Sequence, residues 1–280
     1  MLRRLLVLLG ESAPSVAARK YAFRLASESD RMQLAGLAGI DLVSLHVPTL
    51  GRAGAASIQA RLEEDLRQQS EELRQRLHET YQRECARHGM PFEWLTFEGD
   101  PDEALLLAAE TRDLLIAGHD ITFEARVGQP LSEMLSRLLA VTPRPVVVCG
   151  DHVPEQGTVL VAYDGSLPAM RALQMFTLIG LGHGIGESVR VLSTHTSEEE
   201  AARRAEGAVS YLHLHGIDAE ALPVATRADP TSVIRSEVAN QKARTLVMGC
   251  YGRRGWRQML FGSTTGKLVE NPPCALFIYH

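Results

Sequence analysis

The sequence predicts an α/β fold made of two similar domains, each a parallel sheet with helices on both faces. Short apolar stretches that suit buried strands alternate with longer segments of helical period. The same order of segments occurs twice, because Ser12-Ala-Pro14 is matched by Ser166-Leu-Pro168. Likewise, Gly99-Asp-Pro101 is matched by Ala228-Asp-Pro230. A repeat over nearly the whole chain predicts two copies of one domain.

The division between the copies is expected at Gly150 to Gly157, a stretch of turn residues without periodicity. It gives two domains, residues 1–150 and 151–280. Each can bury its own core, since 45% of the 280 residues are hydrophobic and 22% are charged.

Net charge and hydropathy indicate which classes of partner and which cellular compartment to expect. A net charge of -5 and a pI near 6.1 give no argument for a nucleic-acid partner. No stretch approaches the roughly 18 apolar residues of a membrane span, and Leu5 to Leu9 is too short for a signal peptide. Cysteines 85, 149, 250 and 274 are far apart and form no CxxC pair. Reduced thiols in a cytoplasmic protein are the expectation.

In the first domain, alternation and apolar runs predict five strands and four helices. The strands are expected at Leu5–Leu9, Ile40–Val47, Pro91–Phe97, Asp113–Ala117 and Pro145–Cys149. The helices are expected at Ser12–Ser29, Ser57–His88, Gly99–Glu110 and Leu131–Ala140.

In the second domain the strands are expected at Thr158–Tyr163, Val189–His195, Ile217–Ala225, Leu246–Met248 and Ala275–Ile278. Helices are expected from Ser166, over Ala201–His215, after Asp229 and from Gly262. His195 is expected to correspond to His46, at the end of the second strand in each copy.

The stretch from Thr245 to Thr264 carries the chemistry. An apolar strand leads into Gly249 and Gly252, and nine residues later Gly262-Ser-Thr opens a helix. Glycines let backbone N–H groups approach an anion, and a helix N-terminus offers free N–H groups and the positive end of its dipole. The pattern predicts a phosphate-binding site.

These residues resemble the universal stress protein family in its tandem form. Gly249, Gly252, Gly262 and Ser263 fit the family's G-x2-G-x9-G-[ST] nucleotide motif, and Asp164 ends the first strand as in that family. The resemblance implies a five-stranded sheet of order 3-2-1-4-5 in each domain, with ATP at the carboxyl ends of strands one and four. The switch-point rule for open α/β sheets gives the same location.

Applied to this sequence, the resemblance implies a set of residues that bind ATP, either alone or together with Mg²⁺. Asp164 lies near the adenosine and the second strand lies beside the base. The glycine motif holds the phosphates. The implied residues are Asp164, Thr194, His195, Thr196, Gly249, Tyr251, Gly252, Gly262, Ser263 and Thr264.

The first domain departs from this pattern. Gly10 stands where Asp164 stands, and Ile121 replaces the second glycine. Counting back from the fifth strand places Glu133 and Met134 opposite Gly262 and Ser263, so a carboxylate would face the phosphates. We expect no ATP in the first domain.

Three functions stay open from the sequence. The leading one is a cytoplasmic stress-response protein that binds ATP in its second domain. The second is an enzyme that hydrolyses ATP slowly or transfers a nucleotidyl group at the same site, although no general base is evident. The third is a nucleotide-free interaction module.

The resemblance also implies that the fifth strands of the two domains pair, here Val146–Val148 with Ala275–Ile278 in one chain. The sequence leaves a homodimer open.

Overall fold

The structure is a computed structural model that describes residues 2–29, 31–41, 55–123, 135, 138–139, 142–181, 188–250 and 263–280. Within these residues, strands and helices alternate along both halves of the chain. None of the described helices is both long enough and apolar enough to cross a membrane.

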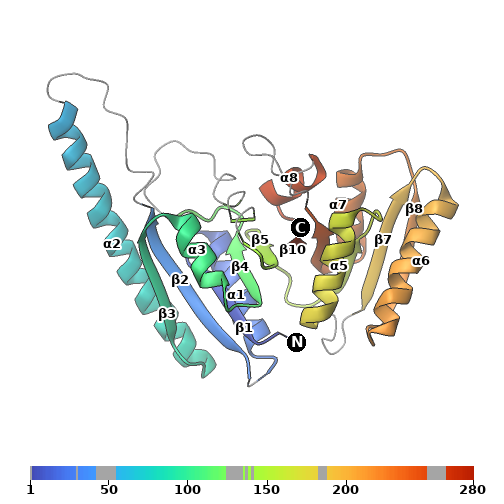
Figure 1. Ribbon diagram of the computed structural model, residues 1–280, viewed down its shortest axis with the longest axis horizontal. Helices are drawn as coiled ribbons and strands as arrows, with labels where there is room; N and C mark the ends of the chain where they lie inside the picture. Colours follow the sequence, from blue (N-terminus) through green and yellow to red (C-terminus); the bar gives the residue numbers. More distant parts are fainter. Residues whose placement is uncertain are drawn as a thin grey trace.

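Ten described strands form one sheet in the order β3-β2-β1-β4-β5-β10-β9-β6-β7-β8 (Figure 1). Each half has the expected order 3-2-1-4-5, with parallel neighbours. The N-terminal strands are β1 (Arg4–Leu8), β2 (Gln33–Asp41), β3 (Glu93–Gly99), β4 (Leu114–Gly118) and β5 (Val146–Cys149). The C-terminal strands are β6 (Thr158–Ala162), β7 (Val189–His195), β8 (Ala219–Ala225), β9 (Ala243–Gly249) and β10 (Ala275–Tyr279).

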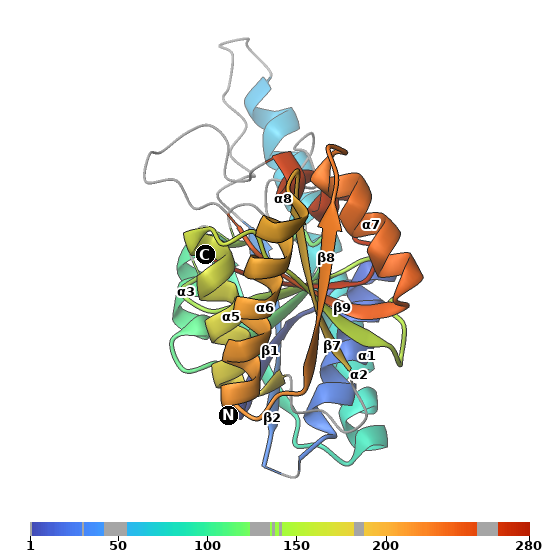
Figure 2. The ribbon, with the colours of Figure 1, turned by 90° about the vertical axis from the view of Figure 1, so that its right-hand side faces the viewer.

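Helices cover both faces of this sheet. One core contains α1 (Ala13–Ala26), α2 (Ala55–His88), α5 (Leu167–Ile179) and α6 (Glu198–Leu214). The other contains α3 (Pro101–Ala109), α7 (Pro230–Asn240) and α8 (Ser263–Glu270). Viewed from the β8 edge, α6 and α7 lie on opposite sides of the sheet (Figure 2).

The two halves meet in the middle of the sheet, where β5 and β10 are antiparallel. Val147 lies opposite Phe277, and Val146 lies opposite Ile278. All four side chains are fully buried. Phe277 also contacts Phe176 of α5, with ring centroids 5.9 Å apart. Each of the two cores therefore runs through both halves of the chain without interruption.

The corresponding helices α1 and α5 begin in the same way. Ser12 and Ser166 are the N-cap residues, and their side chains accept hydrogen bonds from the backbone N–H groups of Ser15 and Ala169. A proline follows in the first turn of each helix, where its missing N–H leaves no hydrogen bond unmade. The two Ser-x-Pro motifs therefore place both helix starts directly after the first strand of each half.

The prediction for the second strand was wrong in its bounds. The structure places β2 at Gln33–Asp41, whereas the apolar run predicted Ile40–Val47, of which residues 42–47 lie outside the described residues. The sequence of β2 contains Gly36 and Gly39, which weaken a strand signal. Both are needed for packing, since a side chain on Gly36 would meet the Tyr81 ring at 2.8 Å and one on Gly39 would overlap Phe97.

The strand registers also correct the proposed match between two histidines. Leu37 lies beside Leu8 as Leu192 lies beside Ala162, so His195 corresponds to Ile40. His46 lies outside the described residues, as does most of the helix expected at Leu131–Ala140.

Candidate functional site

A cavity of about 250 Å³ lies where β6, β7 and β9 end. It is bounded by the sheet and by the first turns of three helices. The residues that line it are Ala162, Tyr163, Asp164, Ser166, Pro168, Ala169, Leu192, Thr194, Pro230, Ile234, Met248, Gly249, Thr264 and Thr265.

The helices that reach the cavity all present their N-terminal ends to it. Ala169 belongs to the first turn of α5, Pro230 begins α7, and Thr264 is the second residue of α8. The first turn of a helix carries N–H groups without intrahelical partners and the positive end of the helix dipole. Three such ends around one cavity favour a negatively charged ligand.

The polar side chains of the lining are mostly hydroxyls, contributed by Ser166, Thr194, Thr264 and Thr265. Asp164 is the one charged side chain among the described residues that line the cavity. Its Oδ1 accepts a hydrogen bond of 2.9 Å from the backbone N–H of Ser166, which fixes the turn between β6 and α5. Asp164 is itself exposed, so its second oxygen can accept from a ligand.

The remaining wall of the cavity is apolar. Leu192 and Met248 come from β7 and β9, and Ile234 comes from α7. An apolar wall beside hydroxyls and helix N-termini can hold a molecule with a flat or apolar part and an anionic part.

Four of the ten predicted site residues line this cavity, namely Asp164, Thr194, Gly249 and Thr264. His195 and Thr196 are not among the residues that line it. His195 Nδ1 instead accepts a hydrogen bond of 3.0 Å from the backbone N–H of Ser197, and Thr196 is exposed. Ser263 begins α8, and Tyr251, Gly252 and Gly262 lie outside the described residues.

Gly249 has a packing role that is independent of any ligand. A side chain at Gly249 would overlap the backbone of Pro168 at the start of α5. Gly118 ends β4 in the same way, and a side chain there would lie 2.7 Å from the backbone nitrogen of Ser15 in α1. Both halves therefore need a glycine at this strand end so that the first helix can approach.

The corresponding strand ends of the N-terminal half are filled. Gly10 and Gly39 correspond to Asp164 and Thr194, and the space that they line together with α2 has a volume of about 10 Å³. A ligand larger than a water molecule does not fit there.

Four apolar side chains belong to the core on the face of the sheet opposite α2, and we call Phe97, Ile121, Phe123 and Leu135 the plug. The ring of Phe97 occupies the space above Gly39, and Phe123 packs edge-on against it with centroids 4.8 Å apart. Ile121, Phe123 and Leu135 are buried. The register makes Val224 the counterpart of Phe97, and Thr264 stands where Leu135 stands by the count from the fifth strand.

The N-terminal half also places a carboxylate of its own at the start of α1. Ser12 Oγ donates a hydrogen bond of 2.9 Å to Asp120 Oδ1, and Ser15 Oγ lies 3.0 Å from Ser12 Oγ. A negative charge at a helix N-terminus is stabilising. Asp120 thus satisfies this helix end internally, whereas Tyr251 occupies that position in the C-terminal sequence.

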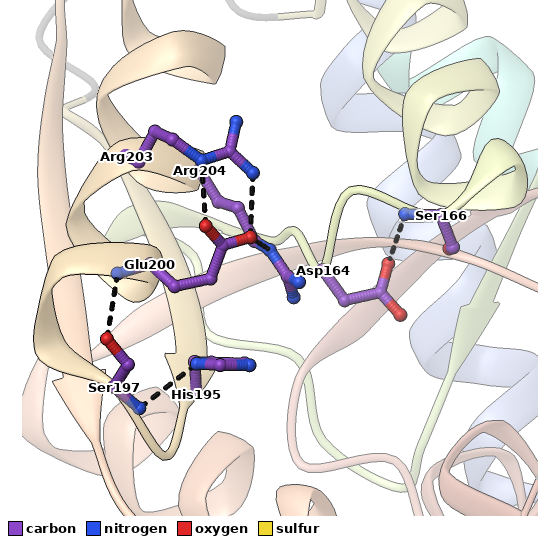
Figure 3. Close-up of polar contacts among 7 residues, drawn as sticks. All are labelled: Asp164, Ser166, His195, Ser197, Glu200, Arg203 and Arg204. Carbon is purple, nitrogen blue, oxygen red and sulfur yellow. Dashed lines mark hydrogen bonds and ion pairs between the residues drawn. The ribbon is translucent and has the colours of Figure 1, made fainter.

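A cluster of charges on α6 lies beside the turn that carries Asp164 (Figure 3). Glu200 accepts hydrogen bonds from both guanidiniums, at 2.7 Å from Arg203 Nη2 and 2.7 Å from Arg204 Nε. These bonds lower the pKa of the Glu200 carboxyl to about 2. Burial raises the pKa of the cavity residue Tyr163, and so does the neighbouring Asp164 carboxylate.

Two further groups near the glycine motif have structural explanations. Burial raises the pKa of the Cys250 thiol to about 12, so it stays protonated and is a poor nucleophile. Lys267 lies one turn into α8, and its Nζ is 3.7 Å from Asp229 Oδ2. Among the described residues, no three His, Cys, Asp or Glu side chains come together in a way that could hold a metal ion.

Comparison with solved structures finds the same fold over the whole chain. A universal stress protein from Archaeoglobus fulgidus is 19% identical, with 98% of this chain and 97% of that chain covered and a TM-score of 0.67. A protein of unknown function from Pseudomonas aeruginosa PAO1 is 15% identical, with 99% and 92% covered and a TM-score of 0.53. Identities this low support the two-domain α/β fold and nothing finer.

The family assignment comes from the sequence. No curated protein matches the chain. The family model described as the universal stress protein family matches residues 157–280, which include every residue that lines the cavity. Through these residues, the C-terminal half of the chain is similar to the universal stress protein family.

Proposed function

We propose that the C-terminal half binds ATP in the cavity at the ends of β6, β7 and β9, and that the N-terminal half has no nucleotide site. The observation that carries the proposal is the convergence of three helix N-termini on one cavity. In the proposed complex the phosphates lie toward Thr264 and the glycine motif, and the adenosine lies between Asp164 and the apolar wall.

The charge balance supports an anion at this place. Asp164 is the one carboxylate of the described lining, and three helix dipoles oppose it. Thr264 and Thr265 add hydroxyl donors at the start of α8, beside the free N–H groups of that helix. In the N-terminal half, the start of α1, which matches α5, instead has the Asp120 carboxylate bonded to its N-cap residue Ser12.

The proposed role is binding rather than turnover. A phosphoryl-transfer enzyme positions a base or an orienting residue next to the nucleophile. In the described lining, the side chains that ionise are Asp164 and Tyr163, and Asp164 is assigned to the adenosine end. We infer a regulatory protein in which the nucleotide changes the state of the C-terminal half.

Calorimetric titration of the full chain with ATP, with and without Mg²⁺, tests the proposal. Asp164→Ala removes the acceptor at the adenosine end and is expected to weaken binding by about tenfold, the effect of one charge-assisted hydrogen bond. Asp218→Ala is the matched control, because Asp218 is fully exposed and belongs to the turn before β8. Absence of ATP binding by the unmodified chain, or equal affinities of the two variants, would contradict the proposal.

A further inference from the structure

Arg204 of α6 lies against the turn that joins β6 to α5. A side chain built on Gly165, the residue after Asp164, would lie 3.8 Å from Arg204 Cδ and 3.9 Å from Arg204 Nε. The Arg204 stem therefore rests on the turn that carries Asp164. Its guanidinium extends from Glu200 toward Asp164 (Figure 3).

Arg203 is a neighbour with the same partner but a different environment. It contacts the same Glu200 carboxylate through two hydrogen bonds, of 2.8 and 2.7 Å. Its side chain is 68% exposed, whereas that of Arg204 is 25% exposed. Ion pairs one turn apart on an exposed helix are worth little, which accounts for Arg203. An ion pair with Glu200 does not account for the packing of Arg204 against the turn after β6.

The N-terminal half contains a similar arginine, Arg76, whose charge is paired with the carboxylate of Glu11. Arg76 of α2 reaches the turn after β1, where its Nε and Nη2 donate to the two oxygens of Glu11 at 2.9 and 3.1 Å. Glu11 corresponds to Gly165, by the same count that matches Ser12 with Ser166. In the C-terminal half the turn has no side chain at this position. The carboxylate that holds Arg204 is instead Glu200, one helical turn away, which it shares with Arg203.

We propose that Arg204 is a ligand-binding residue. When a nucleotide enters the cavity, the Arg204 guanidinium leaves Glu200 and donates hydrogen bonds to an acceptor at the nucleoside end of the ligand, beside Asp164. This inference rests on the proposed function. The movement is a change of rotamer, because the stem already lies against Gly165. Arg204 also offsets the negative charge of Asp164, which a bound nucleotide would otherwise meet without a cationic side chain in the described lining.

The test is a comparison of ATP and AMP affinities, measured by calorimetry on the full chain and four variants. Arg204→Gln is expected to weaken both ligands by the same factor, about fivefold to tenfold, because both carry the same nucleoside. Arg203→Gln is the matched control and is expected to stay within about twofold. Glu200→Gln releases Arg204 and is expected to tighten binding by about threefold, an effect that Arg204→Gln abolishes in the double variant.

The outcomes separate this inference from the proposed function. If the unmodified chain binds neither nucleotide, both are overturned. If it binds and Arg204→Gln behaves like Arg203→Gln, only the role of Arg204 is overturned. A loss confined to ATP would also overturn it, since that result would place Arg204 at the phosphates. Thermal unfolding of each variant checks that the fold is unchanged.

Discussion

The carboxyl ends of β1 and β4 and those of β6 and β9 are built on one topology, yet the described residues line a space of about 10 Å³ at the first and a cavity of about 250 Å³ at the second. The strand order, the Ser-x-Pro helix start and the glycine at the end of the fourth strand are shared. The difference lies in a few side chains, such as Phe97 in place of Val224 and Leu135 in place of Thr264. The fold supplies the location of a site, and the side chains decide whether it exists.

The comparison also separates ligand chemistry from packing. Gly118 and Gly249 make the same close approach to a helix, and Gly249 also borders the cavity of about 250 Å³. Asp120 and Asp164 both lie by the first helix of their half, but Asp120 is bonded to Ser12 whereas Asp164 is exposed. A residue type at a strand end therefore identifies a site only together with the space around it.

The largest expected effect is on the plug. Phe123→Ala removes a buried ring that packs against Phe97, and we expect the free energy of unfolding to fall by about 3 to 5 kcal/mol. Leu214→Ala is the control, since this leucine is 87% exposed and should change stability little. Denaturant unfolding of both variants measures the difference. A cost below about 1 kcal/mol for Phe123→Ala would show that the region is loosely packed.

The glycines at the ends of β4 and β9 should behave alike if their role is packing. Gly118→Ala and Gly249→Ala each place a methyl group against the backbone of a helix start, and each is expected to cost about 1 to 3 kcal/mol. Gly207→Ala in the middle of α6 meets no atom within 4 Å and should be neutral or stabilising by up to about 1 kcal/mol. Thermal and denaturant unfolding provide the values. Unchanged stability of Gly249→Ala together with weaker ATP binding would instead indicate that this glycine serves a ligand.

Glu200 and Glu11 should both have pKa values below the ordinary range of a glutamate carboxyl. Arg203 and Arg204 lower the pKa of Glu200 to about 2 from 4.5, and Arg76 lowers the pKa of Glu11. A lowered pKa in the folded state means that these ion pairs stabilise the fold above pH 4.5. The Glu200 contribution is lost as the pH falls through about 2.

Carboxyl carbon NMR shifts, followed from pH 7 to pH 2, measure both values. In the Arg203→Gln/Arg204→Gln double variant, the pKa of Glu200 should return toward 4.5, while Glu11 stays unchanged. If Glu200 titrates near pH 4.5 in the unmodified chain, its ion pairs with Arg203 and Arg204 do not form in solution.

The smallest expected effect concerns the thiols. All four cysteines are free and buried, and burial raises the pKa of Cys250 and Cys274 to about 12. We expect almost no reaction with a thiol reagent at pH 8 in the folded chain and complete reaction after denaturation. Rapid labelling of Cys250 in the folded chain, identified by mass spectrometry, would reopen a redox role beside the cavity.

Much of the fold could be predicted from sequence, because both copies contain the same local signals. Ser12 and Ser166 with their prolines predicted two helix starts, and the apolar runs of β1 and β7 predicted two strands. The bounds of β2 could not be predicted, since its glycines are explained by Tyr81 and Phe97, which are distant in sequence. The match of His195 with His46 failed for the same reason.

Only part of the candidate site was predicted: Tyr163, Ser166 and Thr265 line the cavity without having been predicted, whereas His195 and Thr196 were predicted and do not line it. Asp164, Thr194 and Thr264 were expected and line the cavity. Leu192, Ile234 and Met248 also line it, but in sequence they are indistinguishable from core residues. The absence of a nucleotide site in the N-terminal half stays a prediction from Gly10, Ile121, Glu133 and Met134, of which Glu133 and Met134 lie outside the described residues. The aromatic part of the plug could not be inferred, because it depends on strand register.

The central claim is that one nucleotide site exists in this chain and that it lies in the C-terminal half. Methyl-labelled isoleucine and methionine allow both halves to be observed in one NMR titration with ATP. The account predicts saturable shifts of the Ile234 and Met248 methyl groups, which line the cavity, and none at Ile121, which fills its counterpart. Shifts at Ile121, or no shift at Ile234 and Met248, would contradict it.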